Sequence, residues 1–331
     1  MNETPPFGQS AEVSWSLGPT TVHGTVVRPE GSGPFPGVVL VAGSGPTDRD
    51  WDSPLLPGSN GSGRLLAEAL SASGFASLRY DKRASGPHAR ETIPLLIGAM
   101  SMQSHVDELA GAVRTLAERD DVRPDRIFGL GNSEGTLHAL HYQVQAPPIP
   151  LAGLVLTGPP GRSVGAVARS QLAAQARGIP NGEHLLQLYD AAVARFLAGE
   201  PAAADPALPE DVRMLIAALE SPANLPFARQ LWSADAVTPL RELRVPALII
   251  IGKKDLHVDW RADGGPLQRA AAGRPDIRFL FPENANHVLK HEPRPRRGLV
   301  QAEVQRGYNA PDAFLDPETL AAIVSWLLAH A

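Results

Sequence analysis

The sequence contains no cysteine among its 331 residues. Disulfide bonds, thiolate nucleophiles and cysteine-ligated zinc sites are therefore excluded. No apolar run approaches the roughly 20 residues that a membrane-spanning helix needs. The first residues, MNETPPFGQSAEVSW, lack the basic and apolar regions of a secretory signal. We therefore expect a cytoplasmic protein with no membrane as partner.

A strong excess of charge of one sign is also missing. The formal net charge is −5, which gives no indication of a nucleic-acid partner. Hydrophobic residues make up 43% of the chain and charged residues 20%, a balance typical of globular proteins. The length allows one large α/β domain or two smaller ones.

The chain does contain a regular alternation of strand-like and helix-like segments. Residues 12–28 hold two β-type runs separated by Gly18-Pro19 and are expected to form an antiparallel hairpin. The later strand-like runs are apolar on both faces, as in buried parallel strands, and amphipathic helices separate them. We therefore predict a mostly parallel, doubly wound sheet. The runs expected to form these strands are 38–42, 75–81, 125–131, 151–158, 246–251 and 277–281.

The alternation breaks at residues 163–237, which are helical in pattern, rich in Ala and Leu, and jointed by prolines. We predict that this block is a helical cap inserted into a core made of residues 1–162 and 238–331. Residues 291–311 are expected to form a solvated basic loop. A closing helix should follow with Asp316 as its N-cap.

The segment RIFGLGNSEGTLHAL, residues 126–140, runs from a strand through Gly131-Asn132-Ser133-Glu134-Gly135 into a helix. This spacing matches a nucleophile elbow, where a sharp strand-to-helix turn displays a serine at the carboxyl edge of the sheet. Side chains at the two glycine positions would collide with backbone. A second match, Gly161 to Gly165, has no strand leading directly into it. Its Ser163 is better interpreted as a helix N-cap.

Two other interpretations fit the glycine-rich segments less well. A dinucleotide-binding fingerprint at residues 129–135 requires an acidic residue at the end of the next strand, and LVLTG has none. The loop AGSGPTDRD after the strand 38–42 lacks the Lys-Ser/Thr ending of a phosphate-binding loop. We therefore expect neither segment to bind a dinucleotide or a nucleotide phosphate.

A serine nucleophile needs a base, and the base needs an orienting acid. Asp255 follows the strand 246–251, and His287 follows the strand 277–281. Both therefore lie at carboxyl ends of strands, the same edge as Ser133, and a parallel sheet gathers such residues over one crevice. We predict Ser133, Asp255 and His287 as the catalytic residues.

Alternatives to these choices remain open. Asp259 and Asp263 compete with Asp255 as the acid, and His257 competes with His287. His291, beside Glu292, is more simply a surface residue. A further pair, His138 and His141, lies one turn apart on the elbow helix, but no acid or third ligand accompanies it in the sequence. We therefore expect no metal site there.

Two backbone N–H groups are expected to form an oxyanion hole. One belongs to Glu134, the residue after the nucleophile. The other comes from the loop AGSGPTDRD, where Ser44 is the first choice and Gly45 the next. Glycines in this loop allow the backbone to approach a substrate closely.

These motifs resemble the α/β-hydrolase superfamily, in which the chain order is serine, acid, histidine. More narrowly, the chain resembles a group of bacterial esterases typified by the thermophilic esterase EstD. The matching pieces are GSGPTDRD, RYDKR, GNSEG, GKKD and NANH. Two positions depart from that group: Asn132 stands where it usually has histidine, and Ala84 where it usually has glycine.

The resemblance implies a serine hydrolase with a helical cap that acts on carboxylic esters of small molecules without a cofactor. It supports Ser133, Asp255 and His287 as the triad, with Ser44 and Glu134 as oxyanion donors. Thioesterase, acyltransferase or peptidase chemistry uses the same triad and stays open, as does the oligomeric state, for which a homodimer is one option. Phe196, Phe227 and Trp232 of the cap would line an acyl pocket or seal the cap onto the sheet.

Overall fold

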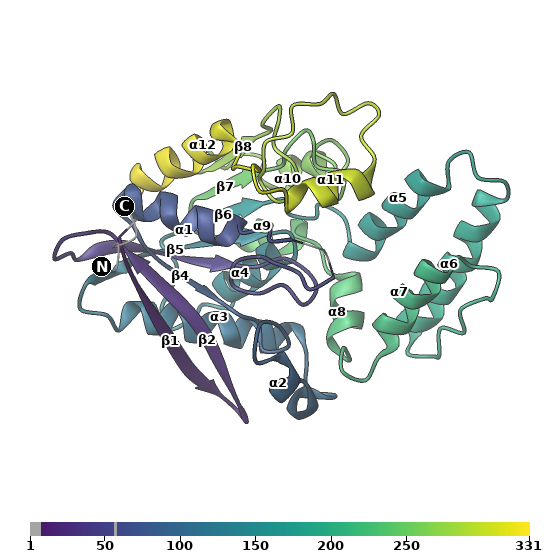
Figure 1. The fold of residues 1–331 in the computed structure, drawn as a ribbon, viewed down its shortest axis with the longest axis horizontal. Coiled ribbons are helices and arrows are strands. Elements are labelled where there is room, and N and C mark those ends of the chain that lie inside the picture. Colours follow the sequence, from purple (N-terminus) through teal and green to yellow (C-terminus); the bar gives the residue numbers. More distant parts are fainter. Residues whose placement is uncertain (1–7, 56–57) are drawn as a thin grey trace.

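A computed structural model describes residues 8–55 and 58–331 of the chain. Within this part the strands form one eight-stranded sheet in the order β1-β2-β4-β3-β5-β6-β7-β8 (Figure 1). The first two strands pair as the predicted antiparallel hairpin, and from β4 to β8 all neighbours are parallel. The strand bounds are β1 Gln9–Leu17, β2 Thr20–Arg28, β3 Phe35–Val41, β4 Ala76–Tyr80, β5 Val122–Asn132, β6 Gly153–Thr157, β7 Ala247–Ile250 and β8 Ile277–Leu280.

Helices cover both faces of the sheet because its central strands are apolar on both sides. In β3, Val39 and Val41 pack with α3 and α4, while Val38 and Leu40 pack with α1 and α12. This confirms the predicted doubly wound arrangement. The helix bounds are α1 Ser62–Ala72, α2 Ala89–Leu96, α3 Met102–Ala117, α4 Glu134–Val144, α5 Val164–Ala176, α6 Gly182–Ala198, α7 Glu210–Glu220, α8 Phe227–Ser233, α9 Val237–Glu242, α10 Gly264–Ala270, α11 Gln301–Tyr308 and α12 Pro317–Leu328.

The order of the strands reverses at β3. The chain passes from β3 through α1 to β4 on one side, and then returns through α3 to β5 on the other side of β3. A crevice opens at such a switch point beyond the carboxyl ends of the strands, and ligands of α/β proteins bind there. The loop after β3 and the elbow after β5 therefore meet at this crevice.

Helices α5 to α8 lie within the block predicted to be a cap and stand to one side of the sheet (Figure 1). They share an apolar core of their own, which includes Tyr189, Phe196 and Ile216. The next helix, α9, instead contributes Leu240 to the core against the sheet. The exact division between core and cap stays a prediction.

Two helix starts predicted from the sequence are confirmed. Ser163 precedes α5, and its hydroxyl accepts a hydrogen bond from the N–H of Ala166 at 3.2 Å. Asp316 precedes α12 and accepts from the N–H of Thr319 at 2.9 Å, with Pro317 as the first helical residue. Ser163 thus has a structural role at a helix terminus.

The prediction of a loop over residues 291–311 is wrong, because α11 lies within it. Only Val304 and Tyr308 of this helix are buried, against a small apolar cluster with Val288. Two apolar side chains one turn apart give too weak a periodic signal to be recognised in a basic segment. His291 is also not a simple surface group, since its ring is bonded to Asp316 at 3.0 Å.

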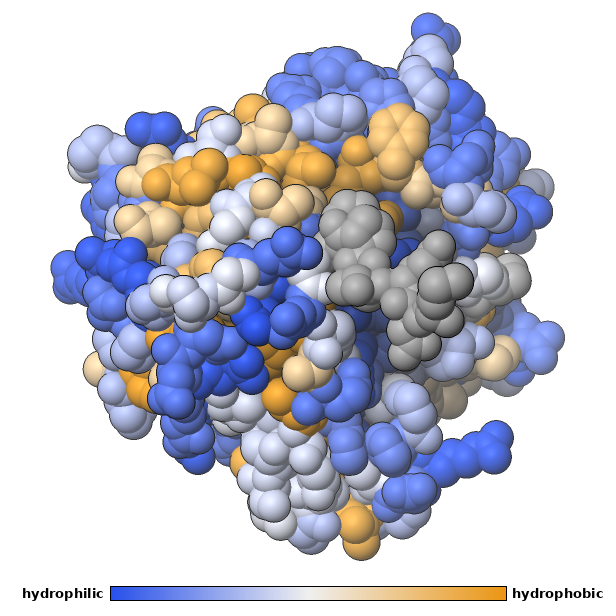
Figure 2. Space-filling view, turned by 60° about the vertical axis from the view of Figure 1, so that its left-hand side comes forward, coloured by the Kyte–Doolittle hydropathy of each residue, from blue (hydrophilic) through white to orange (hydrophobic). Residues whose placement is uncertain are grey.

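The surface carries mixed polarity. On the face shown in Figure 2, hydrophilic side chains predominate and apolar side chains gather in one band across its upper part. No helix in the described part of the chain is long and apolar enough to cross a membrane.

Candidate active site

Ser133 occupies the corner between β5 and α4 with φ 53° and ψ −120°. Its N–H donates to the carbonyl of Thr157 at 2.8 Å, which ties the corner to β6. A Cβ on Gly131 would lie 2.6 Å from the carbonyl oxygen of Gly135, and one on Gly135 would lie 2.4 Å from that of Val41. Both flanking glycines are therefore needed to hold the turn, as the sequence predicts.

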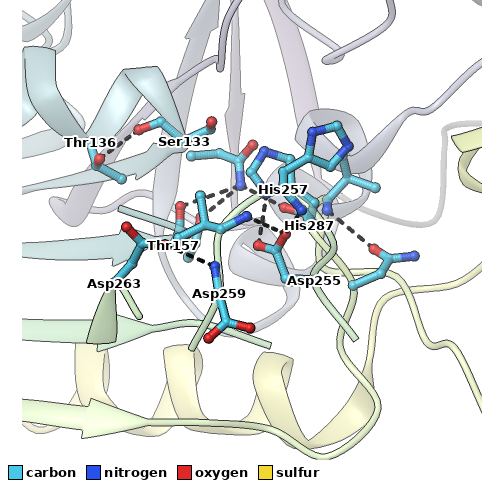
Figure 3. A network of polar contacts seen from close by, with 12 residues as sticks. Ser133, Thr136, Thr157, Asp255, His257, Asp259, Asp263 and His287 are labelled. Carbon is cyan, nitrogen blue, oxygen red and sulfur yellow. Dashed lines mark hydrogen bonds and ion pairs between the residues drawn. The ribbon is translucent and has the colours of Figure 1, made fainter. Parts of the chain in front are cut away.

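Asp255 and His287, which come from the loops after β7 and β8, lie in direct contact. The Asp255 carboxylate accepts a hydrogen bond from Nδ1 of His287 at 2.8 Å (Figure 3). Its other oxygen accepts from the N–H groups of His257 and Val258 at 2.7 and 2.9 Å. Burial alone would raise the pKa of Asp255, but His287 and these bonds lower it below its ordinary value. The carboxylate is thus fixed in orientation and ionised.

The two alternative acids, Asp259 and Asp263, form ion pairs with arginine residues. Asp263 is buried and paired with Arg162 at 2.9 Å, and Asp259 is paired with Arg296 at 2.9 Å. Neither carboxylate is bonded to His287 within the described residues. The structure therefore brings only Asp255 of the three candidates to the histidine.

Ser133 and His287 face one cavity of about 460 Å³. Gly43, Ser44 and Glu134 line the same cavity, while Gly45 does not. In the described part of the chain, the N–H groups of Ser44 and Glu134 have no hydrogen-bond acceptor. These two donors are therefore available to a ligand atom beside Ser133, as an oxyanion hole requires.

Asn132 joins the elbow to the histidine loop. Its side-chain amide donates to the hydroxyl of Thr157 at 3.1 Å and to the carbonyl of His287 at 3.0 Å. The residue is buried, so these bonds satisfy a polar group that would otherwise be costly. The departure from the esterase group at this position thus provides a bond between two predicted catalytic segments.

His257 packs against His287 instead of replacing it. The centroids of the two rings are 4.5 Å apart (Figure 3). Burial and the neighbouring His287 lower the pKa of His257 to about 3, so its ring is neutral near pH 7. His257 therefore supports the imidazole of His287 from one side and forms part of the cavity wall.

The cap side of the cavity is apolar. Trp232 lines it, while Phe196 lies in the core of the cap and Phe227 packs on His105 at 4.5 Å between ring centroids. Of the three predicted aromatic residues, Trp232 thus lines the cavity, Phe227 packs the cap onto the core, and Phe196 packs within the cap. Val164, Val167 and Leu215 also belong to this wall.

Another part of the cavity wall was not predicted from the sequence. Gln305 and Tyr308 of α11 line the cavity, and the Nε2 atom of Gln305 lies 3.3 Å from Nε2 of His257. Because this segment has the composition of a solvated loop, its hydrophobic pattern did not indicate a helix, and these two residues were missed. The basic residues on either side masked the two buried positions of the helix.

A buried polar cluster lies behind the elbow. His138, His105 and Glu134 offer potential metal-ligand atoms within 4.8 Å of one another. His138 therefore does have acidic and histidine neighbours, contrary to what its surroundings in the sequence predicted. The Lys82 ammonium already pairs with Glu134 at 3.2 Å. One of the three potential ligands is thus already paired with a positive charge, and this pair explains how a carboxylate can be buried here.

Comparison with known proteins agrees with this architecture. A sequence model of the alpha/beta hydrolase family matches residues 38–302. The chain belongs to this family. The eight-stranded, mostly parallel sheet with flanking helices is accordingly an α/β-hydrolase fold, and the protein is a hydrolase by its family.

Individual relatives include esterases and a peptidase. The chain is 29% identical over 269 residues to esterase EstD of Thermotoga maritima, a match that covers 80% of this chain and 57% of the relative. An esterase of Pyrococcus furiosus has 15% identity and a TM-score of 0.56, with 98% and 92% of the two chains covered. Proline iminopeptidase of Mycobacterium smegmatis has 18% identity and a TM-score of 0.56, with 97% and 98% covered. At these identities the two structures support the fold alone.

Proposed function

We propose that this protein is a serine carboxylesterase that cleaves small-molecule esters, with short- to medium-chain acyl groups, through an acyl-enzyme. The observation that carries the proposal is the 2.8 Å bond between Asp255 and His287, of which His287 lines the same cavity as Ser133. Two unpaired backbone donors beside the serine and a relative named as an esterase add support.

Acylation follows from this arrangement. Asp255 keeps the proton of His287 on Nδ1, so Nε2 is free to accept the proton of the Ser133 hydroxyl. The serine oxygen attacks the ester carbonyl, and the electron pair of the C=O bond moves onto oxygen. The N–H groups of Ser44 and Glu134 bind this oxyanion. Collapse of the tetrahedral intermediate breaks the bond to the alcohol, which leaves with the proton from His287.

Deacylation repeats the sequence with water. His287 accepts a proton from the water, whose oxygen attacks the acyl carbonyl carbon. The second tetrahedral intermediate collapses, the bond to Ser133 breaks, and the serine oxygen recovers its proton from His287. Free carboxylic acid and unmodified enzyme result. No redox partner or cofactor is needed at any step.

The cavity supports a small substrate. Its volume of about 460 Å³ lies in the range of small-molecule sites, roughly 300–1,000 Å³. The wall formed by Val164, Val167 and Trp232 is apolar and lies on the cap side. A short alkyl chain buried there would gain about 0.8 kcal/mol for each methylene group. We therefore expect butyrate esters to be better substrates than acetate esters.

Hydrolysis of p-nitrophenyl acetate and butyrate tests the proposal. We expect activity in the wild type, loss of at least about 10³-fold in Ser133→Ala, and full activity in the matched variant Ser163→Ala. The same protein would be assayed on an acyl thioester and on a peptide amide. Turnover of the thioester or amide without turnover of either ester would reject carboxylesterase as the function.

A further inference from the structure

Lys82 is a buried cation two residues after the end of β4 and lies behind the predicted oxyanion hole. Its side chain is 7% exposed. The ammonium donates to the carbonyl of Gly43 at 2.6 Å and to the Glu134 carboxylate at 3.2 Å. Burying an ammonium group is costly unless it is paired and bonded, so this placement has to be maintained by these two partners.

The bond to Gly43 acts on a single peptide unit. The carbonyl of Gly43 and the N–H of Ser44 belong to the same planar trans peptide and point in opposite directions. A hydrogen bond that fixes the Gly43 carbonyl therefore also sets the direction of the Ser44 N–H. A hydrogen bond from an ammonium also polarises the amide, which strengthens its N–H as a donor. Lys82 thus orients the Ser44 donor without approaching the cavity itself.

The bond to Glu134 acts on the second donor residue. The carboxylate of Glu134 is held by Lys82 and by Nε2 of His138 at 3.1 Å, and the residue lines the cavity. Burial alone would raise the pKa of this carboxyl, but Lys82 and His138 lower it well below its ordinary value. The ionised carboxylate balances the ammonium, and the Lys82 side chain contacts both the Gly43–Ser44 peptide and Glu134.

The loop that carries Ser44 is also held from the residue before Lys82. Asp81 accepts from the backbone N–H of Arg49 at 2.8 Å and from its guanidinium at 2.7 and 3.1 Å. Consecutive residues after β4 therefore fix both ends of the segment 43–49. Arg83, the next residue, points elsewhere and bonds to Glu108 at 2.9 Å.

We propose that Lys82 is a positioning residue of the oxyanion hole, which aligns the Ser44 N–H through the Gly43 carbonyl and holds Glu134 beside it. The inference rests on the proposed function, since it concerns the same acyl-transfer site. It assigns a role to the fourth residue of the RYDKR segment, a residue that does not line the cavity. Lys82 stabilises the transition state through the two donors that it holds in place.

The test compares Lys82→Met with Arg83→Met. Both substitutions remove one buried positive charge from adjacent positions, but only Lys82 bonds to the Gly43 peptide. Removing an oxyanion donor outright costs about 10²–10³-fold in turnover, so misaligning one should cost about 10–10²-fold in kcat. We expect little change in KM for Lys82→Met and nearly wild-type kcat for Arg83→Met.

A second variant guards against failure to fold. Lys82→Met leaves Glu134 as an unpaired buried carboxylate, whereas Lys82→Met/Glu134→Gln removes both charges and keeps the Glu134 backbone. We expect the double variant to show the same fall in kcat. Equal kcat in wild type and the folded Lys82 variant, or equal losses in Lys82→Met and Arg83→Met, would overturn the proposal.

The rate of inactivation by a fluorophosphonate separates this inference from the proposed function. The phosphoryl oxygen of the probe occupies the oxyanion hole, so we expect inactivation of the Lys82 variants to slow by a factor similar to that in kcat. A wild type that reacts with the probe but hydrolyses no ester would reject the esterase function, and the inactivation rates would still decide the role of Lys82. A wild type that does neither would reject both.

Discussion

Substitution of Gly135 by alanine tests how the elbow is built. A Cβ at this position would lie 2.4 Å from the carbonyl oxygen of Val41 and 2.6 Å from that of Ala42. Ordinary contacts begin near 3.4 Å, so α4 and the end of β3 must separate by about 1 Å. Overpacking of this kind typically costs about 1–3 kcal/mol of stability.

The same shift would alter catalysis, because the loop that begins at Ala42 carries Ser44. A displacement of about 1 Å in reacting groups can cost about 10²-fold in rate. We therefore expect Gly135→Ala to lower kcat by about that factor and the melting temperature by roughly 2–4 °C for each kcal/mol lost. Ester hydrolysis and thermal unfolding followed by circular dichroism measure the two effects.

Gly265→Ala provides a matched control for this experiment. Gly265 lies in α10, and the nearest atom to an added Cβ is a flexible Arg269 nitrogen at 3.5 Å. Alanine there should raise stability by about 0.4–1 kcal/mol and leave activity unchanged. If Gly135→Ala were as stable and active as this control, the close approach of α4 to β3 would not exist.

Two further predictions concern polar groups near the elbow. Asn132→Ala leaves the carbonyl of His287 without its donor. We therefore expect a loss of about 1–3 kcal/mol in stability and a lower kcat with little change in KM. Unchanged thermal unfolding and kcat would refute the role of this bond. Burial lowers the pKa of His138 from 6.5 to about 4, so the unfolded chain binds a proton in that interval that the folded chain does not. Urea unfolding should therefore show stability falling by on the order of 3 kcal/mol between pH 7 and pH 4 through this group, and falling less in His138→Gln, whereas equal slopes in the two proteins would contradict the shift.

The sequence predicted which candidate residues would meet at one edge of the sheet, because this follows from strand order. Ser133, Asp255 and His287 each follow a buried strand, and parallel pairing makes the ends of such strands meet at one edge. The need for glycine at the elbow and the role of Ser163 as a helix N-cap could also be predicted from the sequence, because local backbone geometry determines both. These features depend on neighbours in the chain or on the alternation of elements.

The parts that escaped prediction depend on long-range packing. The bond from Lys82 to Gly43 joins residues 39 positions apart, and that from Asn132 to His287 spans 155. Neither pair has a periodic or spacing signal. The run of charged residues directly after β4 was visible as part of a family motif, and its position at the same edge of the sheet as Ser133 was a signal that could have indicated buried pairing.

Peptide mapping by mass spectrometry after reaction with a fluorophosphonate identifies the nucleophile. We predict one adduct per chain, on the hydroxyl of Ser133, formed at least about 10²-fold more slowly in His287→Ala and absent in Ser133→Ala. An adduct on Ser163, or no adduct on a folded wild-type protein, would contradict the assignment of Ser133 as the nucleophile.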